Sequence, residues 1–292
     1  MSKPLISVII PTYHRNDLLA SCLDWLSPSV QLLSADQYEV IVSDDGTHST
    51  AENMIKELYA WVRWVQGPRQ GSPAANRNCG ASHAIGEWLV FTDDDCLPVH
   101  DWLVVFSVAM YNQAIALEGA IHPDNNKKID MSECPINLTG GCFWTANVAV
   151  RRDIFIEVNG FDEGYPAAAY EDIDLYLRLQ KIGEIPFISE AKVIHPVRVM
   201  NLYSAIKRIP KICASWAYHT KKHKDFLGYK TDLEAALGIL SNGRGMFYSL
   251  KQLHIQECIS KTAYLIIGAP LTYYYRINIK ADSLSTVKEL LS

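Results

Sequence analysis

The alternation of apolar runs with helix-period segments over the first hundred residues constrains the fold most strongly. Leu5–Ile10 reads LISVII, and Tyr38–Ser43 and Glu87–Thr92 are two further runs rich in apolar residues. Continuous apolar runs of this length are typical of parallel strands covered on both faces. Segments with apolar residues at helical spacing separate them. The sequence therefore predicts an α/β fold with a mostly parallel central sheet and helices on both faces.

The remaining elements follow from the same two periodicities and from turn-forming residues. Helices are expected from about Asp17, over Thr50–Trp61, over Pro73–Ile85 and over Ile173–Ile182 with Gly183 as its cap, and strands at Val62–Gln66, 116–121, Ile185–Ile188 and Lys192–His195. A polar loop covers 122–136, and apolar structure resumes over 138–150. From residue 201 helix-period segments carry many Lys, His and Tyr residues. We expect an α/β domain over 1–200 and a helical C-terminal appendage over 201–292.

Composition excludes several classes of protein. The formal net charge of −5 gives no support for nucleic-acid binding. The seven cysteines are scattered and form no CxxC pair, which disfavours a disulfide framework or a zinc site and favours a reducing compartment. The apolar stretch 262–277 is interrupted by Gly268, Pro270 and Arg276 before it reaches the ~20 residues of a membrane span. We expect a cytoplasmic protein, with contact at the inner face of a membrane left open.

Polar and acidic residues follow three of the expected strands. They are Pro11, Thr12, Tyr13 and Arg15 after the first, Asp44 and Asp45 after the second, and Asp93, Asp94 and Asp95 after the strand that ends in VFT. Ligands bind at the carboxyl ends of parallel strands, and adjacent carboxylates favour Mg²⁺ or Mn²⁺. The alternative, acidic residues that cap the next helix, stays open for Asp44 and Asp45. The sequence contains no P-loop and no GxGxxG, so Arg77 is a candidate to contact phosphate.

Five stretches together resemble the GT-A glycosyltransferases of family 2. They are ISVIIPTYHR, VIVSDDG, NRNCGASHAIGEWLVFTDDD, ANVAVRRDIFIEVNGFDE and EDIDLYLRL, and they occur in the family's order between residues 4 and 197. The resemblance implies a Rossmann-like GT-A fold over 1–200, with a nucleotide-sugar half over 1–115 and an acceptor half over 116–200. Residues 198–292 resemble no family that we can assign.

The resemblance also implies roles for single residues. The donor-binding residues would be Pro11, Thr12, Tyr13, Arg15, Asp44, Asp45, Arg77, Asp93 and Asp94, with Asp45 on the base and Arg77 near the diphosphate. The DxD motif is Asp93-Asp94-Asp95, in which Asp93 and Asp95 would hold Mn²⁺ or Mg²⁺ together with His195. A structural histidine is the alternative for His195. Cys96 and Cys142 flank the site, and we interpret both as spectators.

The acceptor side would be formed by the ED motif and a glycine pair. In the family the aspartate of this motif is the general base, here Asp172, beside Glu171. A position in the first turn of a helix predicts a lowered pKa for Asp172. Gly141 and Trp144 would contact the acceptor sugar, while plain core packing is the alternative for Trp144. Base and leaving group on opposite faces imply inversion at the anomeric carbon.

These roles predict a metal-dependent inverting glycosyltransferase. A UDP-sugar is the first expectation for the donor, with dTDP- and GDP-sugars as alternatives, and the acceptor would be a sugar, a glycan or a lipid-linked molecule. Two rivals stay open: a sugar transferase to polyprenyl phosphate and a non-catalytic protein that binds nucleotide sugars. A homodimer is also open. Residues Lys207, Arg208, Lys211, Lys221, Lys222, His223 and Lys224 form a basic stretch. This stretch is either a solvated face or a contact with anionic lipid.

Overall fold

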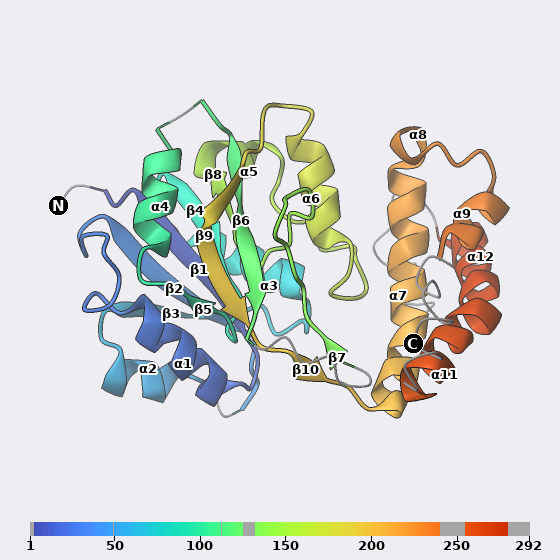
Figure 1. The fold of residues 1–292 in the computed structure, drawn as a ribbon, viewed down its shortest axis with the longest axis horizontal. Helices are drawn as coiled ribbons and strands as arrows, with labels where there is room; N and C mark the ends of the chain where they lie inside the picture. Colours follow the sequence, from blue (N-terminus) through green and yellow to red (C-terminus); the bar gives the residue numbers. More distant parts are fainter. Residues whose placement is uncertain (1–2, 49, 112, 125–131, 240–254, 280–292) are drawn as a thin grey trace. The chain divides into compact units, whose positions relative to one another are not determined.

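The computed structural model describes residues 3–48, 50–111, 113–124, 132–239 and 255–279 (Figure 1). The chain divides into two compact units. Unit 1 consists of 1–125, 134–162 and 171–196, and unit 2 of 126–133, 163–170 and 197–292. Every candidate site residue predicted from the sequence lies in unit 1.

Unit 1 is built on a sheet of eight strands in the order β3-β2-β1-β4-β8-β6-β9-β5 within the described residues. The strands are β1 (Ile6–Thr12), β2 (Tyr38–Asp44), β3 (Val62–Gln66), β4 (Trp88–Phe91), β5 (Leu97–Pro98), β6 (Ala116–Pro123), β8 (Val148–Arg151) and β9 (Phe187–His195). The predicted parallel half is confirmed, because β3, β2, β1 and β4 all pair in parallel. β8 runs antiparallel between β4 and β6, a reversal that the sequence did not predict. The two short strands expected near 185–195 form one strand, β9.

Helices cover both faces of this sheet, as predicted (Figure 1). They are α1 (Asn16–Leu26), α2 (Glu52–Leu58), α3 (Pro73–Ser82), α4 (Trp102–Ala109), α5 (Arg152–Glu157) and α6 (Glu171–Leu179). Successive side chains of a strand point to opposite faces. Val8 and Ile10 of β1 therefore pack with α1, α2 and α4, whereas Ile9 packs with α3, α5 and α6. Both clusters are buried, which explains the continuous apolar run of β1.

Helix α3 is held close to the sheet by its sequence. Ser72 caps it, since its side chain accepts a hydrogen bond from the backbone N–H of Ala75, and Pro73 occupies a first-turn position that needs no donor. A Cβ atom on Gly80 would lie 2.7 Å from Cγ2 of Ile9, so only glycine permits this approach of α3 to β1. The helix ends at Ser82, earlier than predicted. Its close packing places Arg77 beside the carboxyl ends of the strands.

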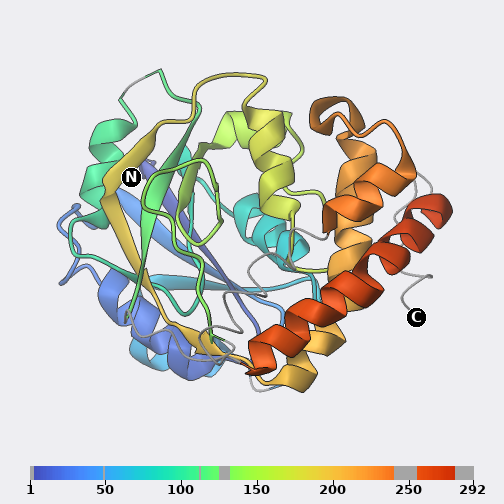
Figure 2. The same cartoon turned by 45° about the vertical axis from the view of Figure 1, so that its right-hand side comes forward.

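Unit 2 is mainly helical, and the predicted C-terminal helices are present. Its elements are β7 (Ser132–Glu133), β10 (Arg198–Val199), α7 (Leu202–Lys222), α8 (Lys224–Leu227), α9 (Asp232–Gly238), α11 (Ile255–Ala263), the π-helix η2 (Tyr264–Gly268) and α12 (Ala269–Asn278). Helix α12 packs along α7 (Figure 2). Their shared core contains Ile209, Cys213, Tyr218 and Tyr275.

The described helices include none that is both long and apolar enough to cross a membrane. The stretch 262–277 is divided between α11, η2 and α12. Pro270 in the first turn of α12 lacks an N–H to donate to the preceding turn, which accounts for the wider π-helical turn at η2.

Candidate functional site

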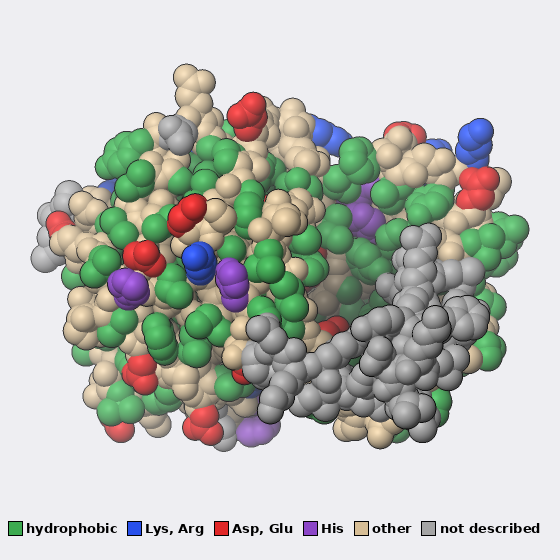
Figure 3. Space-filling model, in the orientation of Figure 1, with side chains coloured by type: hydrophobic (Ala, Val, Ile, Leu, Met, Phe, Trp, Pro, Cys, Tyr) green, Lys and Arg blue, Asp and Glu red, His purple; other side chains and the backbone are tan. Residues whose placement is uncertain are grey.

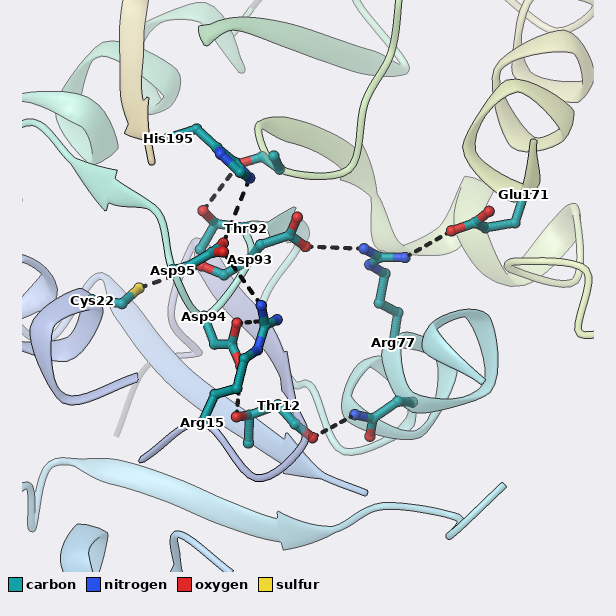
Figure 4. A network of polar contacts seen from close by, with 12 residues as sticks. Thr12, Arg15, Cys22, Arg77, Thr92, Asp93, Asp94, Asp95, Glu171 and His195 are labelled. Carbon is teal, nitrogen blue, oxygen red and sulfur yellow. Dashed lines mark hydrogen bonds and ion pairs between the residues drawn. The ribbon is translucent and has the colours of Figure 1, made fainter. Parts of the chain in front are cut away.

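The three consecutive aspartates follow β4, and Arg15 offsets part of their charge (Figure 4). Nε of Arg15 donates to Oδ2 of Asp94 at 3.1 Å, and its Nη1 lies 3.3 Å from Oδ2 of Asp95. Thr12 at the end of β1 donates from Oγ1 to Oδ2 of Asp94 at 2.7 Å. Burial raises the pKa of Asp94 to about 7, although Arg15 and Thr12 act in the opposite direction. Asp94 therefore joins β1 to the aspartate loop and holds its neighbours in place.

Asp95 and His195 face each other across a gap that fits a divalent cation. Nδ1 of His195 lies 2.9 Å from the carbonyl oxygen of Pro196, which can only accept. In the neutral ring Nδ1 therefore carries the hydrogen, and Nε2 directs a lone pair toward Oδ1 of Asp95 at 3.6 Å. Two acceptor atoms that face each other at this distance are a candidate donor set for a metal ion, and the carbonyl that orients the ring is typical of such sites.

Cys96 lies next to this pair. The ligand atoms of Asp95, Cys96 and His195 are all within 4.8 Å of one another, and all three residues are buried. Burial raises the pKa of the Cys96 thiol well above its ordinary value, and the neighbouring carboxylates raise it further. A protonated thiol is a poor ligand for Mg²⁺ or Mn²⁺. The oxygen and nitrogen donors are the better candidates.

Arg77 connects the aspartate motif to the ED motif (Figure 4). Its Nη2 lies 3.0 Å from Oδ1 of Asp93, and its Nη1 lies 3.2 Å from Oε1 of Glu171. The side chains of Arg77 and Glu171 are only 7% and 6% exposed. Burial raises the pKa of Glu171, and the guanidinium opposes this shift. The structure thus gives Arg77 two carboxylate partners, a contact that the sequence did not predict.

Replacing Arg77 should therefore destabilise the protein. Arg77→Met removes the cation shared by Asp93 and Glu171 and leaves the buried carboxylate of Glu171 without it, which costs about 3–5 kcal/mol in comparable buried pairs. Equilibrium unfolding in urea measures this loss. The matched control is Arg63→Met, since Arg63 is exposed and donates to the carbonyl of His83. Equal stabilities of the two variants would contradict the bridging role.

Asp172 lies in the first turn of α6 and keeps partial access to solvent. Its Oδ1 accepts a hydrogen bond from the backbone N–H of Ile173 at 2.8 Å. Burial raises the pKa of Asp172 to about 7, and the charge of Glu171 raises it further. The lowered pKa expected from the helix N-terminus is therefore wrong, because the loss of hydration outweighs the helix dipole and the hydrogen bond.

The two acidic residues after β2 have different surroundings. Asp45 accepts hydrogen bonds from the backbone N–H groups of Arg69, Gln70 and Gly71, and the last two distances are 3.3 and 2.7 Å. The sequence reasoning missed this 69–71 turn, for which the glycine at position 71 was the available signal; its φ in the structure is +63°. Asp45 is buried at the rim where β1 and β2 end.

Asp44 organises its own loop. Its Oδ1 accepts from the N–H of Gly46 at 2.9 Å, its Oδ2 from the N–H of Ala51 at 2.7 Å, and Trp64 Nε1 lies 3.3 Å from Oδ2. These contacts favour the local alternative that the sequence left open for Asp44. Tyr13, in contrast, is 53% exposed and presents its ring at the same rim. Pro11 is a buried part of β1.

The glycine pair lies in a loop between β6 and β8. Gly140 and Gly141 have φ of +80° and +86°, a conformation that favours glycine, and a Cβ on Gly141 would meet no atom within 4 Å. Gly141 therefore borders open space. Trp144 is half-buried and packs against the hydrophobic core, which favours the packing alternative.

The basic stretch of unit 2 does not act as one group. Arg208 Nη1 lies 2.9 Å from Oε2 of Glu133, Lys221 donates to the carbonyl of Arg276 at 3.1 Å, and His223 is buried. Lys207, Lys211 and Lys224 are exposed. On the side of unit 1 that Figure 3 shows, acidic, basic and histidine side chains are scattered singly among apolar ones.

Comparison with known proteins finds a family match within the sheet region. The model of the family described as "Glycosyl transferase family 2" matches residues 7–117. A validoxylamine A glucosyltransferase from Streptomyces hygroscopicus subsp. limoneus is 28% identical over 222 residues, which are 62% of this chain and 49% of the relative. The chain thus spans about half the length of the curated relatives that it matches first.

Two solved structures share the fold. A mannosyltransferase from Pyrobaculum calidifontis in complex with GDP-Man and Mn²⁺ is 18% identical with a TM-score of 0.57, over 100% of this chain and 79% of the other. Staphylococcus aureus TarS 1–349 in complex with UDP-GlcNAc is 15% identical with a TM-score of 0.56, over 95% of this chain and 91% of the other. Both likenesses concern the fold, and the GT-A fold class predicted from the sequence is confirmed.

Proposed function

We propose, from the match of residues 7–117 to the family described as "Glycosyl transferase family 2", that this chain transfers a sugar from a nucleoside-diphosphate sugar to an acceptor hydroxyl with inversion. Residues 1–115 would bind the donor and 116–200 the acceptor, with 201–292 as the helical appendage. The observation that carries the proposal is the division of the acidic residues into two sets. Asp95 faces His195 on one side, while Glu171, which precedes Asp172, pairs with Arg77 on the other.

The donor would lie at the rim formed by the ends of β1, β2 and β4. Asp45, which is buried at this rim, would accept a hydrogen bond from the base, and the exposed ring of Tyr13 would pack against it. Asp95 and His195, with Asp93 nearby, would hold Mn²⁺ or Mg²⁺ against the diphosphate. That ion supplies charge neutralisation of the departing nucleoside diphosphate. The two structural neighbours contain GDP-Man with Mn²⁺ and UDP-GlcNAc, which supports a nucleotide-sugar donor and leaves its base open.

Asp172 would accept the proton of the attacking hydroxyl. A general base works best when its pKa lies near the operating pH, and burial has moved the pKa of Asp172 to about 7. Its partial exposure leaves the carboxylate reachable from the acceptor side. Gly141 borders the open space through which an acceptor sugar can approach. The attack then occurs on the face of the sugar opposite the diphosphate, which inverts the anomeric carbon.

The raised pKa of Asp172 predicts the direction of the pH dependence. The base is active when ionised, so turnover should be constant above pH 7 and fall about tenfold per pH unit below it. Turnover should be measured at saturating donor and metal, so that weaker metal binding in acid does not contribute. Asp172→Asn should show a flat profile at its residual rate. A wild-type profile that stays flat down to pH 5 would assign the base to another group.

The experiment that tests the proposal most directly is a donor panel. UDP-, dTDP- and GDP-sugars are each added with and without Mn²⁺, and thermal stabilisation and release of nucleoside diphosphate are measured. A metal-dependent shift followed by release supports the transferase. Stabilisation without any release from any donor would favour the rival, a non-catalytic protein that binds nucleotide sugars.

Acceptor, location and assembly are further proposals. The acceptor would be a sugar, a glycan or a lipid-linked molecule in polysaccharide or glycoconjugate assembly, and a polyprenyl phosphate is the same-class rival. The protein would act in the cytoplasm, where the exposed Lys207, Lys211 and Lys224 of unit 2 can approach anionic headgroups at the inner face of the membrane. A homodimer is compatible with this arrangement.

A further inference from the structure

Glu118 is a buried carboxylate inside β6, and the sequence reasoning did not single it out. Its side chain is almost entirely buried, at 2% exposure, and its oxygens accept four hydrogen bonds from one loop. Oε1 accepts from Asn137 Nδ2 and Cys142 N, both at 2.8 Å, and from Phe143 N, while Oε2 accepts from Gly141 N at 2.7 Å. Burying a carboxylate costs free energy unless hydrogen-bond donors satisfy it. These four hydrogen bonds therefore fix the loop to Glu118, and we call them the clamp.

The clamped loop is one that would not keep its shape unaided. Gly140, Gly141 and Phe143 all have positive φ, of +80°, +86° and +49°. For Phe143 this conformation is unfavourable and persists only because the surroundings impose it. Asn137, which donates to Glu118, also accepts from Gly140 N at 2.9 Å. Three consecutive N–H groups therefore point inward at Glu118, and the loop is fixed as a unit.

The same loop contacts the helix that carries Asp172. The ring of Phe143 stacks on Tyr176 of α6, with centroids 5.2 Å apart and an interplanar angle of 23°. Tyr176 lies one turn after Asp172 on the same face of α6. The thiol of Cys142 lies near both carboxylates. Burial raises the pKa of this thiol, and the charges of Glu118 and Asp172 raise it further. The clamp, the loop and the proposed base thus form one connected structure.

We propose that Glu118 is a positioning residue for sugar transfer. It fixes the Gly140–Phe143 loop against α6 and thereby keeps the acceptor side in a fixed position relative to Asp172. This inference rests on the proposed function. Glu118 contacts neither donor nor acceptor and takes no proton. Its contribution should appear in turnover and not in nucleotide affinity.

Glu118→Gln is the informative substitution because it keeps the volume. The amide oxygen can replace Oε1 and retain its three donors. The amide nitrogen then faces the N–H of Gly141, which loses its acceptor and meets a second donor. We expect about 10- to 100-fold lower release of nucleoside diphosphate, because a misplacement near 1 Å can cost that much. Nucleotide affinity should not change, and alkylation of Cys142 by iodoacetamide should become faster.

The experiment compares wild type, Glu118→Gln and the control Glu190→Gln, which changes an exposed glutamate of β9. UDP-, dTDP- and GDP-glucose with Mn²⁺ serve as donors, nucleotide affinity is measured by calorimetry, and alkylation of Cys142 is followed by peptide mass spectrometry, with Cys79 as the internal reference. Lower turnover with unchanged affinity and faster Cys142 alkylation supports the inference. Unchanged turnover, or an equal loss of nucleotide affinity, overturns it.

Two further outcomes are decided separately. If Glu118→Gln does not fold, Tyr176→Leu removes the stacking contact with Phe143 and leaves the clamp intact. Wild-type turnover of Tyr176→Leu would then overturn the link from loop to base, and a loss at unchanged affinity would support it. If the wild-type protein releases nucleotide from none of the donors, the proposed function fails, and the positioning role fails with it. If the wild-type protein releases nucleotide and only the Glu118→Gln variant loses turnover, the result concerns the role of Glu118 and not the proposed function.

Discussion

Asp172→Asn should lower sugar transfer by about 10²- to 10⁴-fold, the range of a lost general base, while nucleotide affinity stays unchanged. The amide keeps the shape of the side chain and the hydrogen bond that Oδ1 accepts from Ile173 N–H. It cannot take the proton of the acceptor hydroxyl. The aspartates at the end of β4 are untouched by the change, so donor and metal should bind as before.

The measurement is the rate of transfer alongside the dissociation constant of the nucleoside diphosphate. Asp153→Asn is the matched control, because Asp153 also lies in the first turn of a helix but is exposed on α5 and pairs with Arg151. Glu171→Gln is expected to lose less turnover than Asp172→Asn. Its effect should be mainly on stability, since Glu171 is a buried partner of Arg77.

Survival of turnover within a few-fold in Asp172→Asn would have a specific meaning. Either another group is the base, or the acceptor needs none because a phosphate oxygen attacks. The second case is the polyprenyl-phosphate rival. The two cases are separated by the acceptor, because only the second predicts transfer to a polyprenyl phosphate.

The sheet was largely predictable because its strands have recognisable local sequence patterns. Runs such as LISVII are continuous and apolar, and the parallel order follows from the helices between them. The direction of β8 was not predictable from its own residues. Val148–Arg151 is equally apolar in either orientation, and only its pairing with β4 and β6 makes it antiparallel. Such pairings are long-range, and a single sequence does not encode them in any local pattern.

The site was predictable in its residue types and less so in its contacts. The three aspartates at a strand end were visible in the sequence, but which cation offsets which acid was not. Arg15 pairs with Asp94 and Asp95, while Arg77 pairs with Asp93 and Glu171, which is 94 positions away in the chain. The prediction that the pKa of Asp172 is lowered was wrong for the same reason. The helix dipole is a local effect that the sequence shows, whereas burial depends on the whole fold.

The sequence around Glu118 contains a signal from which its buried contacts could have been predicted. A glutamate within the run ALEGAI interrupts a strand that is otherwise apolar, and an acid buried in a strand must be satisfied by something. The pattern predicts that partners exist. It does not say that they are the N–H groups of a loop more than twenty residues later, so the clamp becomes visible only in three dimensions.

Asp95→Ala should remove the metal dependence of nucleotide binding. In the wild-type protein UDP should bind much more tightly with Mn²⁺ than with chelator, because Asp95 and His195 on one side and the diphosphate on the other would share the ion. The variant loses one of the two facing donors. Even a residue that only orients a metal ligand changes metal affinity by 10- to 100-fold, so the loss here should be at least about 100-fold.

The fold should survive this substitution. Arg15 keeps its contacts with Asp94, and Thr12 still joins that residue to β1. Removing a carboxylate from a cluster of three also relieves repulsion, so thermal stability without metal should be equal or higher. Calorimetric titration of UDP in Mn²⁺ and in excess chelator gives the four affinities needed, and Asp153→Ala serves as the surface control. Equal affinity of the wild-type protein in both conditions would remove the ion from donor binding.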